Sequence, residues 1–232
     1  MKIGILALGR PTFDVQYAKE RLAASLNYLN TTNHNIFGSC ELLLDEQDAH
    51  NEINKLKKED LDFIIIIQVT FTDSSTILKI ATCLEKPIGI WAFPEPRQSG
   101  RLRLNAFCGL NLASHTLGLN NIPFSWIYEN PENIEEAKFE ILINSNNSKR
   151  PEKILEIPSL GSKKAKSIKE KIHNFKIGKI GSHPDGFDTC KYDQKKLIGL
   201  CGIKVDEIEI DTFLKNSKKV KSEEIETTLN KL

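Results

Sequence analysis

The sequence predicts an α/β protein whose first domain is a doubly wound parallel sheet of the Rossmann or flavodoxin-like kind. Strand-length apolar runs alternate with amphipathic, helix-length segments through residues 1–148, which is typical of repeated β-α units. One run, DFIIIIQVT at 62–70, is almost continuous isoleucine, and such a strand needs burial on both faces. Because crossovers between parallel strands place helices on both faces, ligands are expected at the carboxyl ends of the strands.

Five strands are expected in this domain, each an apolar run of strand length. They are placed at residues 3–8, 35–44, 62–70, 87–93 and 124–129. A helix is expected after each strand, because a capping side chain or a proline precedes the amphipathic segments. The helices are expected to begin after Asp14, after Asp45, after Asp73 or Ser74, near Phe107 with Asn105 as cap, and at Pro131.

A polar stretch with a proline, NSNNSKRPEK at 144–153, predicts a linker between a first domain at 1–148 and a second at 149–232. The second domain is expected to hold a helix at 159–175, strands at 176–181 and 203–210, a helix at 192–202, and a last helix capped by Ser222 with Ile225, Leu229 and Leu232 on one face. Two strands do not make a stable doubly wound sheet alone. This part is therefore predicted to be the start of a second α/β domain that exposes apolar surface and associates.

The composition excludes several classes of protein. No run approaches the roughly 20 apolar residues of a membrane helix, and the amino terminus lacks the cleavage site of a signal peptide. The five cysteines have no CxxC spacing, which argues against a disulfide framework or zinc knuckle and agrees with a cytoplasmic location. Residues 149–232 carry 19 Lys and Arg against 13 Asp and Glu, but these lysines are interspersed with glutamates on expected helices, so a solvated face is favoured over a nucleic-acid site.

The loops that follow the first and third strands hold the main candidate binding residues. Gly9-Arg10-Pro11-Thr12 lacks the GxGxxG pattern, and Pro11 removes a backbone donor, so a dinucleotide site is disfavoured. Arg10 is a candidate for binding sugar hydroxyls or a carboxylate, or for capping a neighbouring element. Phe71 either stacks on a ligand or covers the core. Asp73 is interpreted as a helix cap rather than a catalytic acid.

The segment at 92–111 contains a long polar loop for a tight domain, and such loops are usually functional or disordered. Cys108 lies in the helix start that follows it. A thiol there has a possible role as a nucleophile, but the sequence places no histidine beside it. Cys108 is therefore interpreted as a small buried residue.

The segment GSHPDGFDTCKYD at 181–193 contains histidine, aspartate and cysteine in close succession. Its spacing fits neither an EF-hand nor a zinc ribbon, so a complete metal site is disfavoured. A turn at Pro184-Asp185-Gly186, with fixed and then positive φ, accounts for most of its composition. Such a turn directs His183 or Phe187 toward a cleft between domains, and His183 is therefore counted as a substrate-binding candidate.

The order of these segments resembles a known family. GRPTFD follows the first strand, VTFTDSS follows the isoleucine strand, PIGIWAFPEP and FCGLN flank a Gly-Arg loop, and GKIGSHPDGFDTCKYD precedes LCGIKVDEIEI. The series is similar to the amino-terminal half of the L-fucose/L-arabinose isomerase-like sugar isomerases, and the likeness covers nearly the whole chain. It implies an aldose–ketose isomerase that binds a small-molecule sugar and moves a proton between adjacent carbons through an enediol.

The resemblance also implies site residues and partners. Arg10 and Phe71 match an arginine and an aromatic residue that reach the site of a neighbouring subunit, and Asn111 lies in a helix start near the same rim. The family uses Mn²⁺, held by two acidic residues and a histidine from later parts of its fold. This chain stops before those parts, so no residue here is assigned a catalytic or metal-binding role.

Two interpretations of the function are open. In the first, the chain is the amino-terminal portion of a metal-dependent fucose/arabinose-type isomerase, active as a homo-oligomer or with a complementing carboxyl-terminal half. In the second, it is a non-catalytic sugar-binding or interaction module. Neither involves nucleic acid or a membrane.

Overall fold

A computed structural model describes residues 1–97, 100–144 and 163–231. The chain divides into two compact units, Met1–Ile154 with Asp185–Thr189, and Leu155–Pro184 with Cys190–Leu232. The predicted domain boundary after residue 148 and the predicted linker, apart from its first residue, lie outside the described residues. None of the helices in the described ranges has the length and apolar character needed to span a membrane.

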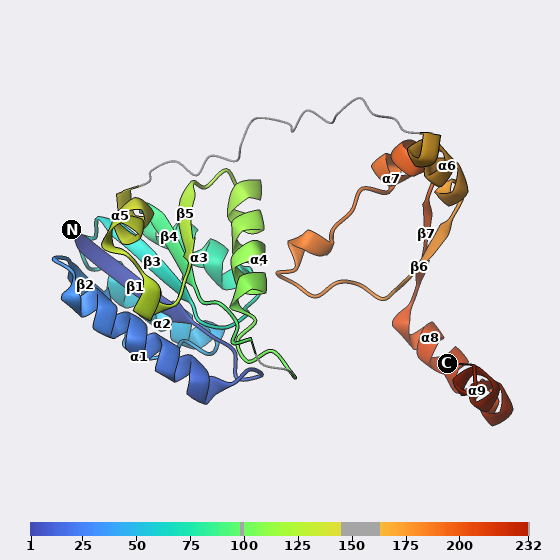
Figure 1. Ribbon diagram of the computed structural model, residues 1–232, viewed down its shortest axis with the longest axis horizontal. Helices are drawn as coiled ribbons and strands as arrows, with labels where there is room; N and C mark the ends of the chain where they lie inside the picture. Colours follow the sequence, from blue (N-terminus) through green and yellow to red (C-terminus); the bar gives the residue numbers. More distant parts are fainter. Residues whose placement is uncertain (98–99, 145–162, 232) are drawn as a thin grey trace. The chain divides into compact units, whose positions relative to one another are not determined.

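The first unit is built on a five-stranded sheet in which every neighbouring pair is parallel (Figure 1). Its strands are β1 (Lys2–Leu8), β2 (Asn35–Gly38), β3 (Phe63–Gln68), β4 (Ile88–Ala92) and β5 (Phe124–Tyr128), in the order β2-β1-β3-β4-β5. This order and the intervening helices confirm the predicted doubly wound fold. The chain builds outward from β1 to β2 and then crosses to β3, so the switch point where such sheets bind ligands lies between the carboxyl ends of β1 and β3.

The second strand is shorter than predicted, because the chain leaves the sheet at Gly38. The φ of Gly38 is +123°, and a Cβ there would lie 2.3 Å from the backbone oxygen of Ile5. The chain returns only at Leu43, whose N–H donates to Ala7 O at 2.8 Å in an isolated bridge. The prediction of a continuous strand at 35–44 was therefore wrong for its second half.

Helices cover both faces of this sheet. They are α1 (Val15–Thr31), α2 (Glu46–Leu56), α3 (Ser75–Leu84), α4 (Ala106–Leu119), the 3₁₀ turn η1 (Pro131–Asn133) and α5 (Glu136–Asn144). α1 and α5 share one face, since the rings of Tyr28 and Phe139 pack 5.3 Å apart. α2, α3 and α4 pack side by side on the other face. The single helix predicted from Pro131 is in fact η1 and α5, because Ile134 between them has extended backbone.

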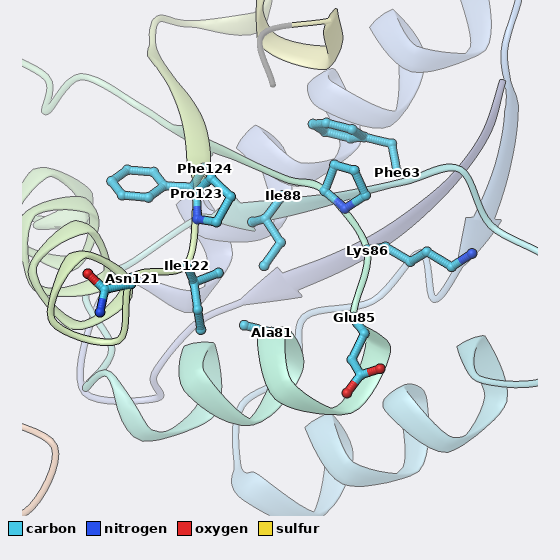
Figure 2. A pocket seen from close by; sticks show the side chains of 10 residues that line it. Phe63, Ala81, Glu85, Lys86, Ile88, Asn121, Ile122, Pro123 and Phe124 are labelled. Carbon is cyan, nitrogen blue, oxygen red and sulfur yellow. The ribbon is translucent and has the colours of Figure 1, made fainter. Parts of the chain in front are cut away.

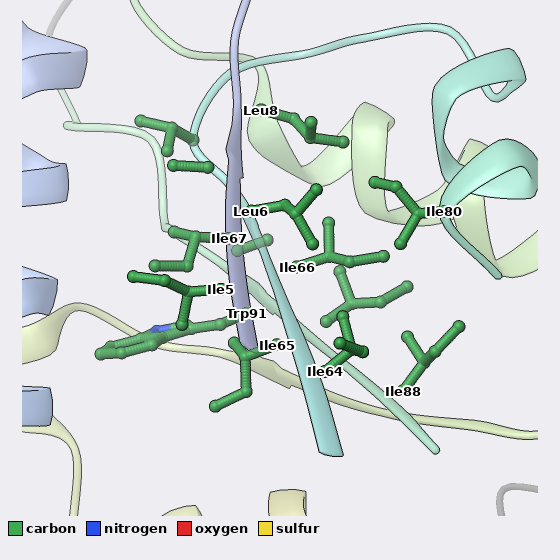
Figure 3. Close-up of a cluster of buried hydrophobic side chains, with 14 of the residues drawn as sticks. Ile5, Leu6, Leu8, Ile64, Ile65, Ile66, Ile67, Ile80, Ile88 and Trp91 are labelled. Carbon is green, nitrogen blue, oxygen red and sulfur yellow. The ribbon is translucent and has the colours of Figure 1, made fainter. Parts of the chain in front are cut away.

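The core confirms that the isoleucine strand is buried on both faces. Ile64, Ile65, Ile66 and Ile67 are all 0% exposed. Figure 3 shows Ile64 and Ile66 on the side of β3 that faces Ile80 of α3, and Ile65 and Ile67 on the opposite side. Full burial of a large aliphatic side chain stabilises a fold by about 1.5–3 kcal/mol, so this strand contributes strongly to the stability of the unit. The central strand thereby fixes the position of the loop that follows it.

The second unit is a smaller α/β arrangement. It contains α6 (Lys163–Ile172), β6 (Lys176–Ile180), α7 (Gln194–Cys201), β7 (Lys204–Ile208), α8 (Ile210–Ser217) and α9 (Ser222–Leu229). The 3₁₀ turn η2 (Asp188–Cys190) follows β6 along the chain, and its first two residues belong to the first unit. β6 and β7 pair in parallel. The predicted strand to residue 210 was too long, and α8 was not predicted. Ser222 is the first helical residue rather than the cap, which is Lys221, and Leu232 lies outside the described residues.

Large apolar side chains of the second unit are exposed among its described residues. They include Phe175, Ile177, Leu200, Phe213 and Leu229. A two-stranded sheet covers too little area to bury such side chains by itself. The exposed surface agrees with the sequence analysis, and association of the isolated chain remains a prediction.

Candidate functional site

The carboxyl ends of β1 and β3 bring together two of the predicted site residues. The N–H of Arg10, in the loop after β1, donates to Thr70 Oγ1 at 2.8 Å. The Arg10 guanidinium forms an ion pair with Asp73 and lies 5.8 Å from the ring centroid of Phe71. Arg10 therefore sits at the switch point of the sheet, held by a carboxylate and beside an aromatic face.

Asp73 connects this ion pair to the start of α3. Its Oδ1 accepts a hydrogen bond from Ser75 N–H at 3.1 Å and another from the Ser75 hydroxyl. The carboxylate thus contacts the helix terminus, in line with its interpretation as a cap, and also holds Arg10. Ser74, the alternative cap, makes no side-chain capping bond within the helix. Its hydroxyl donates instead to Gly186 O at 2.6 Å.

Gln68, the last residue of β3, organises the same loop and was not singled out from the sequence. It is fully buried, and its Nε2 donates to Thr70 O at 2.6 Å and to Thr72 Oγ1 at 2.9 Å. Thr70 in turn accepts from the Arg10 backbone. The sequence feature that could have identified it is a single amide side chain at the end of a run of isoleucines. A polar side chain in a buried strand needs hydrogen-bond partners, and these lie in the loop that follows.

Two glycines of α4 provide a test of the packing around Gln68. A Cβ at Gly109 would lie 2.8 Å from Gln68 Nε2, whereas a Cβ at Gly118 has open space around it. We expect Gly109→Ala to lower the free energy of unfolding by about 1–2 kcal/mol through overpacking. Gly118→Ala should raise it by about 0.5–1 kcal/mol, because alanine is the better helix former. Urea unfolding of both variants checks this, and equal effects would show that α4 does not press on Gln68.

Glu95 holds the long loop between β4 and α4. Its carboxylate accepts hydrogen bonds from the backbone N–H groups of Arg103, Leu104 and Asn105, the last at 2.8 Å. Asn105 occupies the cap position before α4, as predicted, but its φ is +51° and its side chain makes no capping hydrogen bond. The physical reason is that Glu95 fixes the Asn105 backbone in a conformation from which the side chain does not cap the helix.

The same loop folds back onto the segment after β1. Asp14 caps α1 as predicted, accepting from Tyr17 N–H at 3.0 Å, and also pairs with Arg103 at 2.9 Å. The Arg103 guanidinium lies 3.8 Å from the Tyr17 ring centroid, and Arg101 donates to Thr12 O at 3.0 Å. The loops at 9–14 and 101–105 therefore form one connected rim.

The acid sensitivity of this rim follows from Asp14. The hydrogen bond from the Tyr17 N–H, and after it the one from Arg103, hold the pKa of Asp14 below its ordinary 3.8. A carboxyl group whose pKa is lower in the folded chain than in the unfolded chain stabilises the fold at any pH above its unfolded-state pKa. This stabilisation is lost as the pH falls through the folded-state pKa. Asp14→Asn, which keeps a capping side chain, is expected to melt below the wild type at neutral pH, and the gap should close below about pH 4. A gap in melting temperature that is constant with pH would contradict this.

A hollow of about 230 Å³ opens beside Arg10 at this edge. Its polar lining comes from Arg10, Asp45, Glu46, Thr72, Asp73 and Thr76. Carboxylates accept hydrogen bonds, a guanidinium donates them, and threonine hydroxyls do both. With three carboxylates and one guanidinium, the lining suits the hydroxyl groups of a neutral ligand better than an anion.

Comparison with known proteins identifies the family. The sequence profile of the fucose/sulfoquinovose isomerase amino-terminal domain matches residues 4–147. The chain belongs to the fucose/sulfoquinovose isomerase family. It is similar to the sulfoquinovose isomerase of Priestia megaterium, with 25% identity over 94% of this chain and 44% of that protein. The sulfoquinovose isomerase of Alkalicoccus urumqiensis is 29% identical over 72% of this chain and 34% of its own length. The chain thus spans less than half of the length of these relatives.

Three other residues considered from the sequence do not line the hollow beside Arg10. Asn111 is exposed on α4 and does not line the hollow beside Arg10. His183 belongs to the second unit, where it lines a separate hollow of about 240 Å³ with Lys179 and Glu207. Cys108 is exposed, so its interpretation as a buried thiol was wrong. It lies in the first turn of α4, on the side away from the core.

The metal implied by the family was compared with the side chains present. Within the described residues, no three His, Cys, Asp or Glu side chains lie close enough together to hold a metal ion. Asp73, one of the three acidic residues that line the hollow, is already paired with Arg10 and hydrogen-bonded to Ser75. These residues do not fit a Mn²⁺ site, and no chemical step is assigned through a metal here.

A larger hollow of about 430 Å³ lies at the opposite edge of the sheet (Figure 2). It is formed at the amino ends of β4 and β5, and Phe63, Ile88, Ile122 and Phe124 give it a largely apolar wall. Open α/β sheets bind their ligands at the other edge, where the helix amino termini and loops converge. The hollow beside Arg10 is therefore the better candidate site despite its smaller volume.

Proposed function

We propose that this chain is the sugar-binding amino-terminal part of an aldose–ketose isomerase, and that Arg10 and Phe71 contact the sugar. The observation that carries the proposal is the position of these two residues. Arg10 lines the polar hollow at the β1/β3 switch point, and the Phe71 ring lies 5.8 Å from its guanidinium carbon, in a chain of the fucose/sulfoquinovose isomerase family. In this role the guanidinium donates to sugar hydroxyls, and the Phe71 ring packs against the apolar face of the sugar.

The proton transfer between adjacent sugar carbons is assigned to another part of the enzyme. The chain corresponds to 44% of the Priestia relative, beginning with the family's amino-terminal domain. We propose that Mn²⁺ and its ligands come from the remainder of the enzyme, in the same or a neighbouring subunit. The residues described here would then bind and orient the substrate, which lowers the entropic part of the barrier.

The proposed substrate is a hexose or a pentose. Its neutral hydroxyl-bearing part would lie at the carboxyl ends of β1 and β3. Sulfoquinovose is a candidate because the similar proteins from Priestia and Alkalicoccus are sulfoquinovose isomerases. The acidic lining of the hollow disfavours the sulfonate of such a sugar. We therefore expect the hydroxyl groups, rather than the sulfonate, to face Arg10.

Calorimetric titration of the chain with sulfoquinovose, L-fucose and L-arabinose tests this proposal. Arg10→Ala is expected to weaken the affinity for the bound sugar by about 10- to 100-fold, because charge-assisted hydrogen bonds are lost. Arg21→Ala is a matched control. Arg21 also pairs with a carboxylate, that of Glu132 at 2.8 Å, and lies 5.3 Å from the Tyr17 ring centroid, but it does not line the hollow.

The outcomes separate the two interpretations of the function. No heat from any of the sugars, or an equal effect of the two arginine variants, would reject the proposed site. Binding without Mn²⁺-dependent ketose formation, when the chain is supplied with its complementing carboxyl-terminal half, would favour a non-catalytic sugar-binding module.

A further inference from the structure

Residues 185–189 belong to the first unit, although they are far in sequence from the rest of it. The Gly186 carbonyl oxygen accepts two hydrogen bonds from Ser74, one from the backbone N–H at 3.2 Å and one from the hydroxyl at 2.6 Å. Ser74 is buried and stands directly before α3, where backbone N–H groups lack partners within the helix. The Gly186 carbonyl therefore takes the place of a capping side chain.

Gly186 also lies directly against the residue that holds Arg10. A Cβ at position 186 would lie 2.9 Å from Asp73 Cβ and 3.0 Å from Asp73 Oδ1. The same carboxylate forms the ion pair with Arg10 and accepts from the Ser75 N–H. A side chain at 186 would displace either this carboxylate or the loop that caps α3.

Phe187 extends the contact to the aromatic part of the site. Its ring centroid is 5.6 Å from that of Phe71, which also lies 6.2 Å from Phe13 and 5.8 Å from the Arg10 guanidinium carbon. Aromatic pairs at such separations contribute beyond the area they bury. One short loop thus touches both neighbours of Arg10, Asp73 through Gly186 and Phe71 through Phe187.

We propose that Gly186 is a positioning residue for Arg10, because its missing side chain lets residues 185–189 cap α3 and hold Asp73 and Phe71 in place. This inference rests on the proposed function, since the sugar is the ligand for which Arg10 is positioned. Gly186 does not contact the sugar. It acts through the Asp73 carboxylate, which fixes the guanidinium and leaves its remaining N–H groups to donate.

The test compares Gly186→Ala with Gly181→Ala by calorimetric titration with sulfoquinovose and L-fucose. The two glycines have similar positive φ values, +76° and +68°, but a Cβ at 181 would meet no atom closer than 3.7 Å. Alanine is strained at both positions, and only at 186 does it press on Asp73. We expect Gly186→Ala to weaken sugar affinity about tenfold and Gly181→Ala to change it less than about twofold. Equal affinities of the two variants would overturn the proposal.

The double variant Gly186→Ala/Arg10→Ala separates positioning from general damage to the fold. If Gly186 acts through Arg10, the double variant binds sugar as weakly as Arg10→Ala alone, because coupled residues are not additive. A further additive loss would contradict the proposal. Should Gly186→Ala fail to fold, Ser74→Ala removes one of the two donors to Gly186 without a clash, and it is expected to act in the same direction with a smaller effect.

Hydrogen exchange without sugar distinguishes failure of this inference from failure of the proposed function. The backbone amides of Ser74 and Ser75 are expected to exchange about tenfold faster in Gly186→Ala than in the wild type. Unchanged exchange would overturn the inference whatever the sugar affinity. Faster exchange in a chain that binds no sugar would support the cap on α3 and reject the proposed function.

Discussion

Trp91→Ala is expected to lower the free energy of unfolding by about 3–5 kcal/mol, the largest effect of any single change considered for this chain. Trp91 is fully buried in β4, and its Nε1 donates to Glu129 O at 2.9 Å. Its ring packs against those of Tyr28, Phe93 and Phe139. Its removal would leave a cavity between the sheet and the α1/α5 face, together with an unpaired backbone oxygen.

Trp126→Ala is the matched control for this prediction. Trp126 belongs to the neighbouring strand β5 but is 57% exposed, so the change is expected to cost less than about 0.5 kcal/mol. Urea unfolding followed by circular dichroism measures both variants without relying on tryptophan fluorescence. Similar losses for the two tryptophans would mean that the α1/α5 face is not packed as described.

Glu95→Ala is expected to have the second largest effect, a loss of about 2–3 kcal/mol of unfolding free energy. Three consecutive backbone N–H groups, those of Arg103, Leu104 and Asn105, would lose a charged acceptor. Glu95→Gln keeps one acceptor oxygen and should fall between the wild type and Glu95→Ala. The rim that contains Asp14 and Arg103 is expected to loosen with the loop.

Glu135→Ala provides the comparison for Glu95. Glu135 has a largely exposed side chain, 3.9 Å from its partner Lys138, and surface pairs of this kind contribute little. Its replacement is expected to cost less than about 0.5 kcal/mol by urea unfolding. If Glu95→Ala lowers the free energy of unfolding no more than Glu135→Ala does, the Glu95 carboxylate does not organise the loop.

The sequence predicted those parts of the fold that depend on local patterns. The run of isoleucines identified the central strand, because only a doubly covered parallel strand tolerates it, and Asp14 and Asp45 identified two helix starts by their capping preference. Arg10 and Phe71 were placed at one edge by the rule that ligands bind beyond the carboxyl ends of parallel strands. Their proximity in the structure agrees with that rule.

The features that the sequence did not predict depend on contacts between distant residues. The Glu95 carboxylate bonds backbone groups eight to ten positions away, and this contact, rather than a preference of Asn105, decides how α4 begins. The Gly186 carbonyl caps α3 from 112 positions away. The Ser74 hydroxyl donates to this carbonyl, so it does not make the side-chain capping bond that a serine before a helix usually makes. The short β2 reflects the close approach of Gly38 to Ile5. No periodicity or capping preference encodes such contacts.

Binding of sugar at the β1/β3 edge is expected to change amide hydrogen exchange there, and this exchange can be measured on the wild-type chain. With saturating sulfoquinovose or L-fucose, exchange is expected to slow in the loops at 9–14 and 70–75 and to stay unchanged around the larger hollow formed by residues 85–88 and 121–124. Slowing confined to that larger hollow, or no slowing in either region, would show that sugar does not bind at the β1/β3 edge.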